Sequence, residues 1–307
     1  MMVFALVAML SYLIFTTLRI VVSDIDFTIG QKKGFRCRCL AEMGINVAMN
    51  PTVKKTDLDL LNMSFDDNYE SFSVKIRGEG GRLNINTLLN PSNPDKELLK
   101  RLFEAWGMTE EEDRIALIDN LIDWVDPNDE HQEHGMEKDQ YEKDYGITGY
   151  PFNRYFYSLD ELLLVPGFDT IASLKPNWRD YLTIYSQGKL DLNEAPADLL
   201  AIVCDTTDTA AQEFVETRWG DDHNEDTKDD KRYSSVEEAL ALLDVGSGPL
   251  ANDPEFAERT SQRLTINDGT TRIESTGTVG DFRRRIIMVV RSRQQPQILT
   301  REEIPLF

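Results

Sequence analysis

The densest group of chemically active side chains lies between residues 123 and 144. This stretch holds nine carboxylates and two lysines, so its net charge is −7. Asp126, Asn128 and Asp129 follow the end of an apolar helical pattern, and a glycine-containing turn brings back Glu137. Ca²⁺ prefers about six to eight hard oxygen ligands, often from a D-x-[DN]-x loop with a later Glu. The spacing is not that of an EF-hand, and by itself it leaves open a calcium site or a solvated acidic loop.

Other chemical signals in the sequence are weaker. His131 and His134 lie in the same stretch, but H-E-x-x-H is absent and no third ligand is singled out, so we interpret them as surface histidines. A second run, 221–230, has six acids and no apolar residue, which favours a mobile loop. The sequence has no G-x-S-x-G elbow, Walker loop or dinucleotide fingerprint.

Composition excludes several classes of protein. The chain has 307 residues, with 54 Asp and Glu against 33 Lys and Arg, for a net charge of −21. This balance argues against a protein that binds a phosphate backbone, because such binding relies on Lys and Arg. Three cysteines are too few for a disulfide scaffold. At 41% hydrophobic residues, the chain can bury a core.

The N-terminus is predicted to be a membrane anchor. Residues 1–18 carry no charge, and Ile20–Val22 extend the apolar stretch beyond Arg19. This length reaches the transmembrane range of about 17 to 25 residues. A cleaved signal peptide is less favoured, because neither a basic n-region nor a small-x-small site is evident. Basic residues follow the segment and none precedes it, so the positive-inside rule puts the C-terminal side in the cytoplasm unless a basic leader precedes Met1.

A helical pattern continues beyond the anchor. Its predicted apolar stripe consists of Phe35, Leu40, Met43, Val47 and Ala48. Pro51 should stop the helix. We therefore predict one long helix, half in lipid and half against a soluble domain, with glycines 30 and 34 as its weak points.

The soluble part combines strands with a long helical stretch. The pattern predicts a hairpin of strands 71–77 and 82–85 and three C-terminal strands, at 262–266, 271–279 and 282–292. Amphipathic helices are expected over 95–106 and 113–125. The predicted organisation is an anchor at 1–22, a helix with the first strands at 23–90, an inserted helical domain at 91–255, and closing strands at 256–307.

Two local patterns recur and indicate an internal duplication of a small helical unit. G-R-L-N-I-N at 81–86 resembles G-K-L-D-L-N at 188–193, and each ends in an Asn that predicts a helix N-cap. S-L-D-E at 158–161 and S-V-E-E at 235–238 both predict capping boxes.

The motifs also follow one another in a specific order. An uncharged N-terminal segment continues to L-A-E-M-G-I-N, then G-R-L-N-I-N-T-L, then L-I-D-W-V-D-P-N-D…G-M-E…Y. S-L-D-E-L-L-L-V-P-G-F, L-D-L-N-E-A-P-A-D-L-L and S-T-G-T-V…R-R-I-I-M-V-V-R complete the series. This set resembles the minor pseudopilin K family of the bacterial type II secretion system over essentially the whole chain.

The resemblance implies an α+β, pilin-like fold. A long N-terminal helix would pack on an antiparallel sheet, and a large α-helical domain would be inserted in that sheet. It implies a non-enzymatic subunit that assembles and caps the pseudopilus tip for protein export, in a complex with the minor pseudopilins I and J. Other pseudopilins and the inner-membrane secretion platform are further implied partners. The chain would be a single-pass protein of the bacterial inner membrane, with its soluble domain in the periplasm and no nucleic acid bound.

The resemblance also implies a structural calcium ion in the helical insert. The family's D-W-x-D-x-D…G-x-E pattern falls on Asp123, Asp126, Asn128 and Glu137, with Asp129 and Asp139 as additional expected ligands. An Asn replaces a frequent Asp at position 128, which removes one charge but keeps an oxygen ligand.

The N-terminal helix fits a K-type subunit in one further respect. Most pilins carry a glutamate near the start of the mature helix, and K-type subunits lack it; here no acid precedes Asp24. A prepilin has a basic leader ending in Gly, and none precedes Met1. Three explanations stay open, namely a trimmed, a processed or a misassigned start, and a basic leader would also resolve the orientation of the anchor.

Two other functions remain as alternatives. Leu164-Val-Pro-Gly-Phe resembles a helix-hairpin-helix turn, which can hold a nucleic-acid phosphate, although Asp160, Glu161 and Asp169 flank it. The acidic stretch would also suit a membrane-anchored metal hydrolase.

Overall fold

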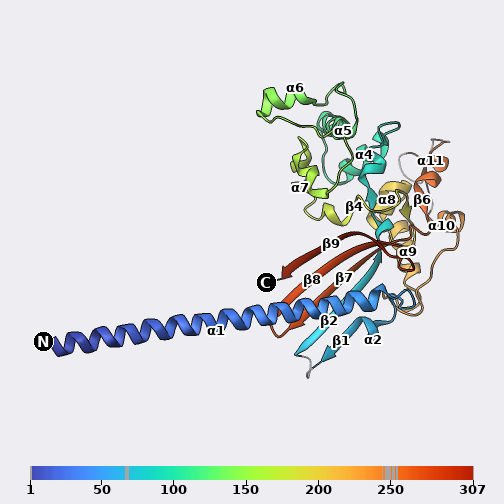
Figure 1. The fold of residues 1–307 in the computed structure, drawn as a ribbon. Helices are drawn as coiled ribbons and strands as arrows, with labels where there is room; N and C mark the ends of the chain where they lie inside the picture. Colours follow the sequence, from blue (N-terminus) through green and yellow to red (C-terminus); the bar gives the residue numbers. More distant parts are fainter. Residues whose placement is uncertain are drawn as a thin grey trace. The chain divides into compact units, whose positions relative to one another are not determined.

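The computed structural model describes residues 2–65, 69–243, 245, 250, 253 and 255–306. The chain forms two compact units (Figure 1), each with its own hydrophobic core. The helix–sheet unit comprises Met1–Ile76 and Arg272–Phe307, and the inserted unit comprises Arg77–Thr271. The helical domain predicted at 91–255 lies within the inserted unit, whose boundaries are wider.

The helix–sheet unit contains one long helix and a five-stranded sheet. Its elements are α1 (Met2–Met49), α2 (Leu58–Leu61), β1 (Asn62–Phe65), β2 (Glu70–Gly78), β7 (Thr270–Val279), β8 (Phe282–Arg291) and β9 (Gln297–Leu306). The strand order is β1-β2-β7-β8-β9, and the β1–β2 and β8–β9 pairs are antiparallel. The predicted α+β, pilin-like architecture is thus confirmed, with α1 lying along the sheet (Figure 1).

The long helix forms as predicted, and it ends before Pro51. Its predicted apolar stripe is partly wrong, because Phe35 is 67% exposed and Met43 is 43% exposed. The face that packs on the sheet carries small residues instead, namely Gly34, Cys37, Ala41, Gly44 and Ala48, together with Leu40 and Ile45. Small side chains let the helix backbone approach the strands closely, which a search for large apolar residues does not detect.

Two strands of the sheet were not predicted. β1 is short, and β9 is an edge strand whose side chains are exposed or half-buried along its whole length. Edge strands commonly carry charges and proline, as Arg301, Glu302, Glu303 and Pro305 do here. Such a strand has no alternation of apolar and polar residues for a sequence pattern to reveal.

The inserted unit is largely helical. Its elements are η1 (Glu79–Gly81), β3 (Leu83–Asn84), α3 (Ile85–Leu88), α4 (Lys96–Ala105), α5 (Glu111–Val125), α6 (Lys138–Gln140), η2 (Tyr141–Tyr145), η3 (Leu159–Leu164), α7 (Phe168–Leu174), η4 (Trp178–Asp180), β4 (Leu182–Thr183), β5 (Leu190–Asp191), α8 (Ala197–Cys204), α9 (Asp208–Arg218), α10 (Val236–Leu243), α11 (Phe256–Arg263) and β6 (Leu264–Thr265). The predicted helices 95–106 and 113–125 correspond to α4 and α5.

The predicted hairpin of 71–77 with 82–85 is wrong. β3 pairs in parallel with β4, and β5 pairs in parallel with β6. Of the strand predicted at 262–266, only Leu264–Thr265 form a strand, β6. Residues 262 and 263 are the end of α11. A parallel partner lies far along the chain and leaves no local turn signal, whereas glycines at 78–81 imitate the turn of a hairpin.

The two recurring patterns have a common structural role: each supplies the first strand of a parallel pair. In both copies an asparagine ties distant backbone together. The Asn84 amide donates to the Ser186 carbonyl at 2.7 Å, and the Asn193 amide donates to the carbonyls of Tyr233 and Ile266. The predicted caps are wrong: Asn84 rather than the final Asn86 caps α3, and Asn193 caps no helix, because α8 begins after Pro196.

The two predicted capping boxes form only in part. The Ser158 hydroxyl accepts from the amide of Asp160 and opens a 3₁₀ helix, η3, in place of an α-helix. The Ser235 hydroxyl accepts from the amide of Glu238, but the Glu238 carboxylate bonds to Ser234 rather than closing the box.

Replacing either buried asparagine with alanine is expected to destabilise the inserted unit. Asn84→Ala or Asn193→Ala leaves buried backbone groups unpaired, which costs about 1–3 kcal/mol for each change. Chemical unfolding followed by circular dichroism measures the loss. The control is Asn90→Ala, which removes an exposed asparagine that bonds only to the local Ser92 amide. Equal midpoints for all three variants would contradict this role.

Candidate metal centre

The end of α5 delivers the first two carboxylates of the site. Asp123 lies in the last turn of α5 and is fully buried, and Asp126 caps the helix with an exposed fraction of 5%. Pro127 follows, and a proline disfavours helical backbone in the residue before it. Asp126 accordingly has extended backbone, at φ −74° and ψ 150°, so the chain leaves the helix there.

The following loop folds back onto Asp123. The backbone amide of Gln132 donates to both of its carboxylate oxygens, at 3.0 and 3.1 Å. Gly135 lies so close that a Cβ there would overlap Oδ2 of Asp123. The glycine of the G-x-E pattern is therefore required for space, and it sets the path by which Glu137 returns to the site.

Glu137 is the least satisfied carboxylate of the three. It is 3% exposed, and neither of its oxygens has a hydrogen-bond partner of normal geometry among the described residues. Its own backbone amide donates to the side chain of Gln140 at 3.1 Å, which fixes the start of α6. A buried carboxylate with two free oxygens is costly unless a cation neutralises it.

All three carboxylates have raised pKa values, because they are buried and have other acids nearby. Burial, and then repulsion from Asp123, Asp126 and Asp129, raises the pKa of Glu137 to about 7. Burial, and then repulsion from Asp126 and Asp119, raises the pKa of Asp123 to about 6, against the bonds from Gln132. Burial likewise raises the pKa of Asp126. Each group makes ionisation of the next less favourable.

An aromatic cluster, which was not predicted, surrounds this site. Its members are Trp124, Tyr141, Tyr150, Phe152 and Phe156, with neighbouring ring centroids 5.0 to 6.2 Å apart. Tyr141 of this cluster lies close enough to Asp123 and Glu137 for their charges to add to the rise that burial causes in its pKa. A signal exists in the sequence, since Trp124 adjoins Asp123 and Tyr141 lies one helical turn after Glu137.

The remaining predicted ligands lie on the outside of the loop. Asn128 and Asp129 are exposed, and the Asn153 amide bridges the Asn128 carbonyl and an oxygen of Asp129, at 3.0 and 3.2 Å. Asp139 is exposed on α6. Within the described part of the chain, no three His, Cys, Asp or Glu side chains already converge in metal-binding geometry.

The residues present nevertheless fit a hard cation. They offer buried carboxylate oxygens, an exposed amide and further carboxylates on one loop, which are the donor types that Ca²⁺ prefers. Glu137 has unbonded oxygens, so binding would cost no existing hydrogen bond of normal geometry there. His131 and His134 are exposed, in line with their interpretation as surface residues.

The other motifs form local structure. In the acidic run 221–230, Asp229 accepts from the amides of Asp221 and Asp222, and Asp230 accepts from those of Asp226 and Thr227. These hydrogen bonds fix the backbone without apolar contacts. The lack of apolar residues in this run is therefore not sufficient to predict a mobile loop.

The turn that resembles a helix-hairpin-helix joins η3 to α7. Val165 and Phe168 are buried in the core, and Gly167 has a left-handed backbone with φ +88°. Glu161 pairs with Arg154, and Asp160 pairs with Arg179. The turn therefore packs its apolar side chains into the core, and its acidic neighbours form ion pairs within the chain.

Acidification is expected to stabilise the calcium-free protein. Glu137 and Asp123 have ordinary values of 4.5 and 3.8, and folding raises both pKa values. Between the unfolded and folded values the native state binds more protons, so the free energy of unfolding falls as pH rises through this window. After exhaustive removal of calcium, calorimetry should show a melting temperature several degrees higher at pH 5.5 than at pH 8. Glu137→Gln should flatten this difference, and a higher melting temperature at pH 8 would contradict the prediction.

The N-terminal helix has the properties of a membrane span. α1 is long and apolar enough to cross a bilayer, and none of its most apolar 18-residue window is buried. Helices of this kind near an N-terminus also occur as signal sequences. The helix is therefore compatible with the predicted anchor.

Comparisons with known proteins address the family and the fold. A family model described as "Type II secretion system (T2SS), protein K" matches residues 81–185, the segment that begins just before β3 and ends just after β4. A chain in the crystal structure of the GspK-GspI-GspJ complex of the type 2 secretion system from enterotoxigenic Escherichia coli has the same fold, with a TM-score of 0.63 and 14% identity. The match covers 92% of the present chain and 99% of that chain. No curated protein matches in sequence.

The two matches agree with each other and with the order of motifs. The family model covers the acidic loop and both strands of the first parallel pair, and the structural match covers 92% of the chain. Neither match supports a nucleic-acid-binding protein or a hydrolase. Residues 81–185 thus match the family of type II secretion system protein K, and the fold of nearly the whole chain is that of a chain in the GspK-GspI-GspJ complex.

Proposed function

We propose that this protein caps the pseudopilus as part of a tip complex with the minor pseudopilins I and J. The supporting observation is the similarity of nearly the whole chain to a component of the E. coli complex of K, I and J. The role is non-enzymatic assembly, since the sequence carries no nucleophile motif and the family is structural. The other pseudopilins and the inner-membrane platform are its further partners.

Co-purification tests the proposed complex. The full chain is co-expressed in detergent-solubilised membranes with the minor pseudopilins I and J of the same secretion system. We expect the three proteins to co-elute in size-exclusion chromatography, with a mass by light scattering that corresponds to one copy of each. An unrelated single-pass protein replaces I and J as the control. Elution of the chain alone in the presence of both partners would contradict the proposal.

We further propose that α1 anchors the protein in the inner membrane, with the rest of the chain in the periplasm. The apolar helix supports an anchor, and the match of residues 81–185 to a secretion-system family supports the envelope. A β-lactamase fused to the C-terminus should confer ampicillin resistance, because the enzyme acts only in the periplasm. A fusion that is expressed and confers no resistance would place the C-terminus in the cytoplasm.

A structural calcium ion completes the proposal. Its ligands would come from Asp123, Asp126, Asn128, Asp129, Glu137 and Asp139. The supporting observation is Glu137, which is buried near two other buried carboxylates and whose oxygens have no hydrogen-bond partner of normal geometry among the described residues. The ion would neutralise charges that otherwise repel one another and would tie α5 to the start of α6.

A further inference from the structure

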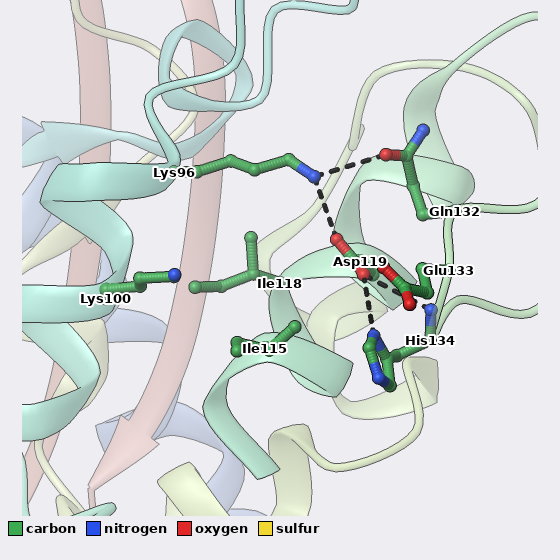
Figure 2. A pocket seen from close by; sticks show the side chains of 8 residues that line it. All are labelled: Lys96, Lys100, Ile115, Ile118, Asp119, Gln132, Glu133 and His134. Carbon is green, nitrogen blue, oxygen red and sulfur yellow. Dashed lines mark hydrogen bonds and ion pairs between the residues drawn. The ribbon is translucent and has the colours of Figure 1, made fainter. Parts of the chain in front are cut away.

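A cavity of ≈ 230 Å³ adjoins the acidic loop. It lies between α4, α5 and residues 132–134, and Ile115 and Ile118 form its apolar wall (Figure 2). Two lysines of α4 reach it, Lys96 and Lys100, one helical turn apart. The two lysines differ in their contacts with α5 and the acidic loop, and this difference bears on the proposed calcium site.

Lys96 joins α4 to both α5 and the loop. Its ammonium donates to Asp119 at 2.9 Å and to the side-chain oxygen of Gln132 at 3.2 Å (Figure 2). Asp119 is 4% exposed and also accepts from the backbone amide of His134 at 3.3 Å. By contrast, the side chain of Lys100 has no hydrogen bond or ion pair among the described residues.

Asp119 and Asp123 hold the same loop from consecutive turns of α5. Asp123 accepts from the amide of Gln132, and Asp119 accepts from the amide of His134. Asp119 has a counter-ion in Lys96, so its charge is compensated where it is buried. Asp123 has no ion pair in the described part of the chain, so a bound cation would be its counter-ion.

We propose that Lys96 and Asp119 are positioning residues for the calcium site. They touch no ion themselves. They hold residues 132–134 so that the Gln132 amide meets Asp123 of α5 and the chain leads back through Gly135 to Glu137. This inference rests on the proposed calcium site. Residues 132–134 are thus held against α5 before a cation binds. Cation binding then has to order only the following residues, which include Glu137.

Electrostatics alone makes a different prediction, which allows the two effects to be separated. Removal of a lysine near a cation site lowers the positive potential there and favours Ca²⁺ binding, whereas removal of an aspartate disfavours it. Loss of loop positioning disfavours binding in both cases. Lys96→Met and Asp119→Asn change the charge in opposite directions but break the same contact.

The experiment is calcium titration by calorimetry of the full chain in detergent, for the unmodified protein and four variants. We expect Lys96→Met and Asp119→Asn each to weaken binding about tenfold, and Lys96→Arg to restore most of it. Lys100→Met is the matched control, because it removes the same charge from the same cavity without breaking a contact. It should change the dissociation constant by no more than about twofold.

Hydrogen exchange of calcium-free protein gives a second readout that does not depend on calcium affinity. Amides of residues 130–136 should exchange faster in Lys96→Met than in Lys100→Met. Opposite changes in affinity for Lys96→Met and Asp119→Asn, or equal behaviour of the two lysine variants in both measurements, would overturn the inference alone. Failure of the unmodified chain to bind calcium would instead overturn the calcium proposal on which it rests.

Discussion

Protein saturated with Ca²⁺ at pH 8 is expected to melt about 10 °C higher than calcium-free protein. A ligand present at about a thousand times its dissociation constant stabilises the native state by about 4 kcal/mol. In a unit of this size each kcal/mol corresponds to about 2–4 °C. The large effect follows from the starting state, in which Asp123, Asp126 and Glu137 are buried and form no ion pair with any residue that the structure describes. Differential scanning calorimetry with and without calcium measures the shift.

A pair of glutamine substitutions shows where this effect originates. Glu137→Gln removes a buried, unbonded charge, so calcium-free protein should melt at a higher temperature and respond little to calcium. Glu133→Gln removes an exposed carboxylate of the same loop and should leave the response intact. A chain that shows no shift with calcium, or an equal shift in both variants, would contradict the assignment of Glu137 as a ligand.

The second large effect is expected where the long helix meets the sheet. Gly277 of β7 lies against the backbone of α1, and a Cβ there would overlap the carbonyl oxygen of Cys37 and approach the amide of Ala41 at 2.7 Å. Backbone atoms cannot swing aside as a long side chain can. Gly277→Ala should therefore displace the helix and destabilise the helix–sheet unit by about 3 kcal/mol or more. Urea unfolding of the detergent-solubilised chain measures this loss.

Gly34→Ala is the control for that change. A Cβ at Gly34 would meet only the flexible side chain of Arg284, at 3.5 Å or more. Alanine is favoured over glycine inside a helix by about 1 kcal/mol, so this variant should be as stable as the unmodified chain or more so. If Gly277→Ala proved equally harmless, the close approach of α1 and β7 would not be a feature of the folded protein.

Local patterns in the sequence were sufficient for part of the fold. The length of α1, the strands β7 and β8 and the helices α4 and α5 all follow from periodicity. The β3–β4 and β5–β6 pairs were missed because each joins segments far apart in the chain. β9 was missed because its exposed faces leave no pattern.

The candidate site was predictable only to the level of its acidic residues. The spacing singles out Asp126, Asn128, Asp129 and Glu137, but it does not distinguish the buried carboxylates from the exposed ones. That distinction depends on the aromatic cluster and on the path of the loop, both of which are tertiary. Lys96 and Asp119 precede the acidic stretch and belong to separate helices, so only the folded structure relates them to it.

The insertion of residues 77–271 between β2 and β7 has a consequence for the order of folding during synthesis. The N-terminal helix and β1–β2 emerge first, but their sheet neighbours follow only after the inserted unit is complete. Until then β2 has an open edge and the small-residue face of α1 has only a partial sheet to cover it. Contacts across such long stretches of chain form slowly, so the inserted unit has time to fold first. The helix–sheet unit is therefore expected to close last, when its C-terminal strands arrive.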